Sequence, residues 1–166
     1  MTRPLAAALA ALLVLPPAAA QAADVVIGLG YSDFNDARAD DSAILELELH
    51  SDPIWHFAGA DWSIAGAVVA HARGDVFVGA GPAAIWQMRN RWFVEASVMP
   101  GHFDAASGAN SLGSDFEIRS LLGIGRAIGE GTSLSLAITH KSNAGSSSSG
   151  RNPGVNALSL RLRRSF

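Results

Sequence analysis

Apolar and polar side chains alternate with a period of two along most of the chain after residue 23. This spacing is typical of β-strands, in which successive side chains point to opposite faces. Stretches rich in Gly, Ser, Asn and Asp separate the alternating segments and favour turns. We therefore predict eight strands, and no long helix, in the mature chain. The strands are expected over residues 24–33, 42–50, 62–72, 75–88, 91–103, 115–126, 132–143 and 155–166.

The two faces of these strands differ in chemistry. One face carries Leu, Ile, Val and Trp, and the other carries charged residues, namely Glu46, Glu48, Glu95, Glu117, Arg119, Arg161 and Arg163. Such charges do not suit an apolar core between two sheets, but they can pair across the interior of a small barrel. The apolar faces then point outward into lipid, and closure leaves no unpaired sheet edge. The pattern predicts an all-β fold: an eight-stranded antiparallel transmembrane β-barrel of the outer membrane.

The connections between the predicted strands support this topology in part. An even number of strands with a periplasmic N-terminus places the connections after the odd-numbered strands outside the cell, where loops are usually longer. Those connections are residues 34–41, 73–74, 104–113 and 144–154. The short connection at 73–74, and the long one at 51–61 on the other side, depart from the trend.

The N-terminus has the features of a secretory signal. Arg3 precedes an Ala/Leu run at 5–15, and Ala20-Gln21-Ala22 is a suitable cleavage site. We expect residues 1–22 to be the signal peptide and residues 23–166 to form one barrel domain. The formal net charge of −3 at pH 7 gives no indication of nucleic-acid binding, and the absence of cysteine means that the exported chain has no disulfide.

Several further features fit a membrane barrel. Phe166 is an aromatic terminal residue on the predicted outward face, and many outer-membrane barrels carry such a residue for recognition by the barrel assembly machinery. The four tryptophans are expected to form an aromatic girdle at the membrane interfaces. The other histidines (His50, His56, His71 and His102) have no metal-ligand spacing, so we expect no metal and no cofactor. The sequence leaves open whether two copies associate as a homodimer.

The most reactive pattern lies near the end of the predicted strand 132–143. His140 and Ser142 share a face with Ile138, so both point outward with the apolar residues. A serine hydroxyl becomes a good nucleophile when a neighbouring base accepts its proton. If the following hairpin is centred near residue 148, His140 faces Asn156. An acceptor at that place fixes the imidazole tautomer, as the third member of a catalytic triad does.

This hairpin resembles the active-site hairpin of the lipid A 3-O-deacylases (PagL-type, acyloxyacyl hydrolase family). The resemblance is carried by His140-Lys141-Ser142-Asn143-Ala144-Gly145, then by Asn152-Pro153-Gly154-Val155-Asn156, and by the segment at 116–123. It implies an outer-membrane barrel that hydrolyses the ester holding an acyl chain at the 3-position of lipid A in lipopolysaccharide. It also implies catalytic residues on the membrane-facing outside of the barrel.

The resemblance assigns roles by position. His140 matches the general base and Ser142 the nucleophile, while Asn143 and Asn152 match asparagines near the oxyanion site. Asn156 stands where the family pattern has a glutamate. Asparagine can orient an imidazole, but it has no negative charge to stabilise the imidazolium.

Other interpretations remain open at this point. Lys141 and Arg151 are candidates for binding lipid A phosphates, or are ordinary solvated loop charges. A non-catalytic outer-membrane barrel that keeps the hairpin for lipopolysaccharide contact or stability is the main alternative to an esterase. A periplasmic lipid carrier is disfavoured, since its barrel would need an apolar interior.

Overall fold

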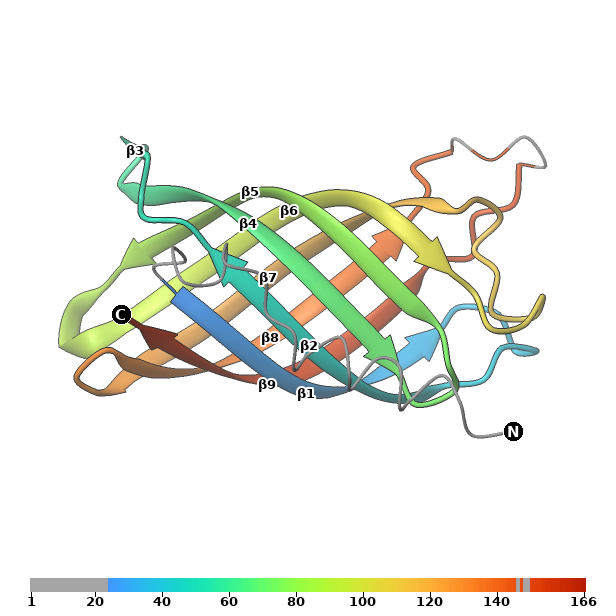
Figure 1. Ribbon diagram of the computed structural model, residues 1–166, viewed down its shortest axis with the longest axis horizontal. Helices are drawn as coiled ribbons and strands as arrows, with labels where there is room; N and C mark the ends of the chain where they lie inside the picture. The colour runs from blue at the N-terminus through green and yellow to red at the C-terminus, as the bar shows by residue number, and fades with distance from the viewer. Residues whose placement is uncertain (1–23, 146, 148–149) are drawn as a thin grey trace.

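The computed structural model describes residues 24–145, 147 and 150–166. In this part of the chain, eight long antiparallel strands form one sheet that closes on itself, because β2 pairs with both β1 and β4 (Figure 1). This confirms the predicted eight-stranded barrel. The signal peptide expected at residues 1–22 lies outside the described residues. The long strands are β1 (Asp24–Phe34), β2 (Ser42–His50), β4 (Ala60–His71), β5 (Val76–Gln87), β6 (Trp92–Asp104), β7 (Phe116–Gly129), β8 (Thr132–Ser142) and β9 (Val155–Ser165).

A short strand that the sequence did not predict explains the long connection after β2. β3 (Trp55–Phe57) pairs with the start of β4, and the two residues between them, Ala58 and Gly59, both have positive φ. Two consecutive residues of positive φ are typical of the tight turns that join hairpin strands. All three β3 side chains are exposed, so a three-residue strand of this kind shows no alternation that a sequence pattern could detect.

The outer surface of the barrel is apolar. Leu29, Leu122 and Ile138 are 65%, 63% and 62% exposed. The two residues that flank each of them along its strand are buried or half-buried. Leucine and isoleucine at this exposure belong in lipid, where apolar side chains are solvated and the closed sheet satisfies every strand edge. The predicted orientation, with apolar faces outward, is confirmed. Within the described residues no helix is long and apolar enough to span a membrane.

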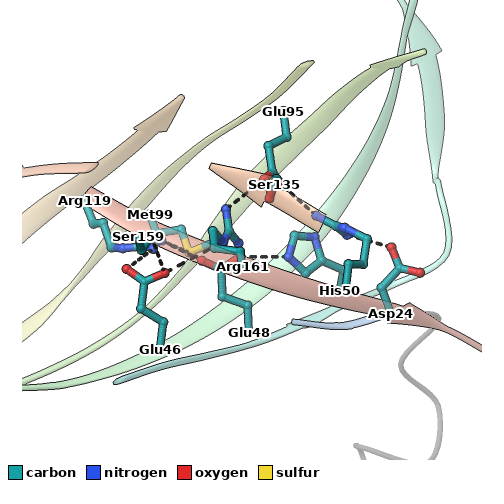
Figure 2. A network of polar contacts seen from close by, with 11 residues as sticks. Asp24, Glu46, Glu48, His50, Glu95, Met99, Arg119, Ser135, Ser159 and Arg161 are labelled. Atoms are coloured by element: carbon teal, nitrogen blue, oxygen red, sulfur yellow. Dashed lines mark hydrogen bonds and ion pairs between the residues drawn. The ribbon is translucent and has the colours of Figure 1, made fainter. Parts of the chain in front are cut away.

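The interior holds a network of charged side chains (Figure 2), together with a buried apolar cluster that includes Phe34, Phe77 and Phe103. Arg119 reaches both Glu48, at 2.9 Å, and Glu46, at 3.3 Å. Arg161 and Arg163 contact Glu95 at 3.2 and 2.8 Å. The predicted pairing across the interior is therefore present for these residues. Glu117 is an exception, because neither of its buried carboxylate oxygens has a hydrogen-bond partner among the described residues.

The two ends of the barrel differ. The connections β1–β2, β4–β5, β6–β7 and β8–β9 lie together at one end, which we call the loop end, and the C-terminus lies at the other, the turn end (Figure 1). Trp62 and Trp86 pack edge to face at the turn end, with ring centroids 6.2 Å apart. Trp55 and Trp92 lie there too, at the start of β3 and β6. The four tryptophans thus gather at the turn end and not at both interfaces as expected, whereas the exposed aromatic residues at the loop end are Tyr31 and Phe116.

Candidate active site at the loop end

His140 lies near the end of β8 and points outward. Its cross-strand partner on β9 is Asn156, and Nδ1 of the imidazole lies 2.8 Å from the side-chain oxygen of Asn156. An amide oxygen can only accept, so Nδ1 carries the hydrogen and donates it. This leaves Nε2 with a lone pair, which is the form that a general base needs. The register predicted from the sequence is therefore confirmed.

Ser142 is the last residue of β8 and lies on the same outward face, where it is half-buried. Within the part of the chain that the structure describes, its hydroxyl makes no hydrogen bond to His140. Catalytic hydrogen bonds are often long or poorly aligned before substrate binds and tighten in the reacting complex. Alternation along one strand nevertheless keeps the two side chains as neighbours on one face.

Gly154 makes room for the imidazole. A Cβ at this position would lie 2.9 Å from Cε1 of His140, and φ of Gly154 is +70°. A side chain there would therefore strain the backbone and press against the ring. The sequence indicates a turn at Asn152-Pro153-Gly154, but only the folded hairpin shows which side chain the glycine accommodates.

Asn143 and Asn152 have different roles. Asn143 is buried, and its amide nitrogen donates to the carbonyl oxygens of Leu112 and Arg151, each at 2.8 Å. Both amide hydrogens are used inside the protein, so Asn143 holds the loops together and has no donor left for an oxyanion. Asn152 is exposed, and its oxygen accepts from the backbone N–H of Asn143 at 3.1 Å. Its amide nitrogen remains the better candidate donor.

Lys141 does not lie at the head-group surface. Its side chain is inward and only 3% exposed, and its Nζ donates to Nε2 of His71 at 2.9 Å. The expectation that Lys141 contacts lipid A phosphates is therefore wrong. Its neighbours in the sequence, His140 and Ser142, point outward, so strand alternation alone requires the lysine to point inward.

Arg151 lies on the loop after β8 and is about one-third exposed. It donates to Asp36 of the β1–β2 loop at 2.7 Å. The hydrogen bonds from Arg38, and a further one from Arg151, hold the pKa of Asp36 well below its usual range, so this carboxylate stays charged. Arg151 thus ties two loops together while part of its guanidinium surface remains accessible.

The site shows no sign of a metal centre. Among residues 24–145, 147 and 150–166, no group of three or more His, Cys, Asp or Glu side chains is placed to hold a metal ion. The groups present (a hydroxyl, an imidazole with a fixed tautomer and an amide donor) are those of nucleophilic acyl transfer.

A family model described as lipid A 3-O-deacylase (PagL) matches residues 27–165, and so covers the barrel together with this hairpin. The chain belongs to the PagL family. A search of curated proteins finds no significant match. Among solved structures, the crystal structure of the outer membrane enzyme PagL is similar, with a TM-score of 0.69 and 20% identity, over 87% of this chain and all of that one.

A second solved structure, the Neisserial surface protein A, matches with a TM-score of 0.56 and 11% identity, over 86% of this chain and 95% of that one. At these identities the two likenesses show the fold, an outer-membrane β-barrel. The family match and the barrel together place this member of the PagL family in the outer membrane.

Proposed function

We propose that this protein is a serine esterase of the outer membrane that hydrolyses the 3-position acyl ester of lipid A in lipopolysaccharide. The observation that carries the proposal is the hydrogen bond between His140 and Asn156 on the lipid-facing surface. It orients the imidazole on the same outward face as Ser142, at the loop end of β8. Membership of the lipid A 3-O-deacylase family supplies the substrate class.

The reaction follows from the residues at the site. Nε2 of His140 accepts the proton of Ser142 as Oγ attacks the ester carbonyl carbon. The tetrahedral intermediate collapses, the C–O bond to the sugar breaks, and His140 returns the proton to the sugar hydroxyl. Water then attacks the acyl-serine with the same imidazole as base, which releases the fatty acid and restores Ser142.

The surroundings fit a lipid substrate. Below His140, Ile138 and Leu136 on β8 and Leu158 on β9 are 62%, 49% and 51% exposed, so they offer an apolar track to the acyl chain. The amide nitrogen of Asn152 is our candidate donor to the oxyanion. One such donor typically contributes about two to three orders of magnitude to turnover.

Two substitutions test the proposal directly. We expect Ser142→Ala and His140→Ala each to lower deacylation by roughly a thousandfold or more, because the residues of a triad act as a unit. The measurement is mass spectrometry of lipid A from cells that express each variant, with heat-dependent gel migration to show that the barrel folds.

Ser120→Ala is the matched control. Ser120 is exposed on β7 and is the cross-strand partner of His140 on the side away from Asn156. We expect it to retain deacylation. Loss of activity in Ser120→Ala with normal activity in Ser142→Ala would reassign the nucleophile, and unchanged lipid A in cells with wild-type protein would refute the esterase.

A second function is favoured by one residue. Asn156 replaces the glutamate of the family pattern, as expected of a barrel that keeps the hairpin for lipopolysaccharide contact without catalysis. Asn156→Glu separates the two functions. Deacylation that appears only in this variant would support the non-catalytic barrel, whereas deacylation by the wild-type protein would exclude it.

We also propose, on the sequence alone, that residues 1–22 are removed on export and that the assembly machinery recognises Phe166. Phe166 is 85% exposed in the folded barrel. Deletion of Phe166 is expected to lower the amount of folded barrel in the outer membrane.

A further inference from the structure

Asn156 has two cross-strand neighbours. On one side β9 pairs with β8, which brings His140 opposite Asn156. On the other side β9 pairs with β1, which brings Asp33 opposite the same residue. Closure of the barrel creates this second contact, because β1 and β9 are the first and last strands of the chain.

Asp33 points to the same surface as the site. It is exposed, and along β1 it has the parity of the outward residues Leu29 and Tyr31, whereas its neighbours Ser32 and Phe34 are buried. His140, Asn156 and Asp33 therefore form one row across three adjacent strands, on the outside of the loop end. A charged side chain that faces lipid is unfavourable except near the interface, so an exposed aspartate on this surface calls for an explanation.

The amide of Asn156 can join the two ends of this row. Its oxygen accepts from His140 on the β8 side. Oxygen and nitrogen diverge from Cγ, so an amide whose oxygen points to β8 directs its nitrogen away from β8. Among the described residues this nitrogen makes no hydrogen bond, so it is free to donate. Side chains directly opposite on antiparallel strands have Cβ atoms about 4.5–5.5 Å apart, a separation that an amide and a carboxylate can bridge with one hydrogen bond.

We propose that Asp33 is a positioning residue that supplies, through Asn156, the negative charge that the site otherwise lacks. A rotation of the Asp33 side chain lets its carboxylate accept from the amide nitrogen of Asn156, which fixes the amide and polarises its oxygen toward Nδ1 of His140. The imidazolium formed during acyl transfer is thereby stabilised. This inference rests on the proposed esterase function and deepens it.

No other charge faces His140 from the strands packed against it. On β7 its partner is Ser120, and on β8 and β9 its outward neighbours are Ile138, Ser142 and Leu158. Lys141 points inward, and the loop charges Asp36, Arg38 and Arg151 contact one another. Asp33 is thus the carboxylate in this row that can act on the imidazole.

The test compares Asp33→Asn with the wild-type protein, using purified folded barrel and lipopolysaccharide in detergent. We expect kcat to fall roughly 10- to 100-fold, the range typical when a group that orients a functional side chain through one partner is removed. KM is expected to change little.

Asp104→Asn is the matched control. Asp104 is also exposed at the loop end of an outward face, but it lies on β6, three strands from β9. The Asp104→Asn variant should leave kcat unchanged. Asp33→Glu should retain most of the activity, because the carboxylate is kept; equal losses in Asp33→Glu and Asp33→Asn would indicate a purely structural role and overturn the proposal.

A double substitution gives a sharper outcome. In an Asn156→Glu background a carboxylate contacts the imidazole directly, so adding Asp33→Asn should cause no further loss. The same loss in both backgrounds, or no loss in either, would overturn the role of Asp33 while leaving the esterase in place. An inactive wild-type protein would instead refute the esterase and this inference together.

Discussion

Two histidines near the loop end lie on opposite faces of the same sheet. His140 points outward and has one side-chain partner, the amide of Asn156. His71 points inward, where Lys141 donates to its Nε2 at 2.9 Å and Ser32 lies 3.2 Å from its Nδ1. Each histidine therefore lies near a serine. Only the difference in exposure distinguishes the candidate active site around His140 from the structural cluster around His71.

The inner cluster is closed to substrate. Ser32 and His71 are 0% and 2% exposed, and the rings of Phe34 and Phe103 pack against the imidazole at 5.9 and 6.1 Å. Lys141 can only donate, so His71 accepts at Nε2 and donates from Nδ1 to Ser32, which in turn donates to the carbonyl of Ser42 at 3.0 Å. Each residue in this series of hydrogen bonds has a partner inside the protein, whereas the hydroxyl of Ser142 is available to an ester.

The difference shows how alternation along a strand places candidate catalytic side chains on the outer face and stabilising side chains on the inner face. His140 and Lys141 are consecutive, as are Asp33 and Ser32, yet the members of each pair face lipid and interior respectively. A shift of one residue in register would exchange the two sets. The pairing of His140 with Asn156 therefore decides which polar groups meet the membrane.

The largest expected effect comes from removing each histidine in turn. His140→Ala should lower deacylation by roughly a thousandfold or more without unfolding the barrel. His71→Ala should instead leave a folded, active enzyme of lower stability, because it empties a buried site and leaves Lys141 without an acceptor. Lipid A mass spectrometry measures deacylation, and urea unfolding measures stability. A His71→Ala protein that is folded but has lost deacylation would contradict the difference between the two histidines.

Next in size is a charge placed in the middle of the outward face. Leu136 lies at the centre of β8 and is 49% exposed. Leu136→Arg should lower the free energy of unfolding from lipid vesicles by about 2–4 kcal/mol, the cost of a basic residue at the bilayer midplane. Leu136→Met is the control and should change little. Equal stability of the two variants would mean that this face is not in lipid.

A smaller effect is expected inside the barrel. Ser32→Ala should destabilise the protein by about 1–3 kcal/mol, because it leaves Nδ1 of His71 without its buried acceptor. Deacylation should be retained. Ser120→Ala, on the exposed outer face, is the matched control and should leave stability unchanged; a similar loss in both serine variants would argue against the inner hydrogen-bond chain.

The smallest effect concerns the loops. Arg151→Gln removes the contact with Asp36, a partly exposed ion pair at the surface of the loops, and ion pairs that water can reach contribute little. We expect a rise of a few-fold at most in KM and no change in kcat. Because the pKa of Asp36 is lowered, the carboxylate is charged at every pH above its usual range, so the effect should be the same from about pH 5 upward. A strong pH dependence there would contradict this assignment.

The sequence by itself determined the barrel and the face that carries the site. Alternation predicted the eight long strands within a few residues, and the parity of His140 and Ser142 with Ile138 placed both on the lipid side. These features can be predicted because the alternation of side chains along a strand depends only on neighbouring residues in the sequence. The Asn156 partner was also predicted, since a hairpin relates residues close in sequence.

Only the tertiary structure decided the rest. Asn143 was a candidate oxyanion donor until the fold brought Leu112 against its amide, and β3 was too short to leave a pattern. Asp33 and Asn156 are more than a hundred residues apart, and they meet because the barrel closes between its first and last strands. Closure pairs positions that are far apart in the sequence, so the carboxylate opposite Asn156 became visible only in the folded protein.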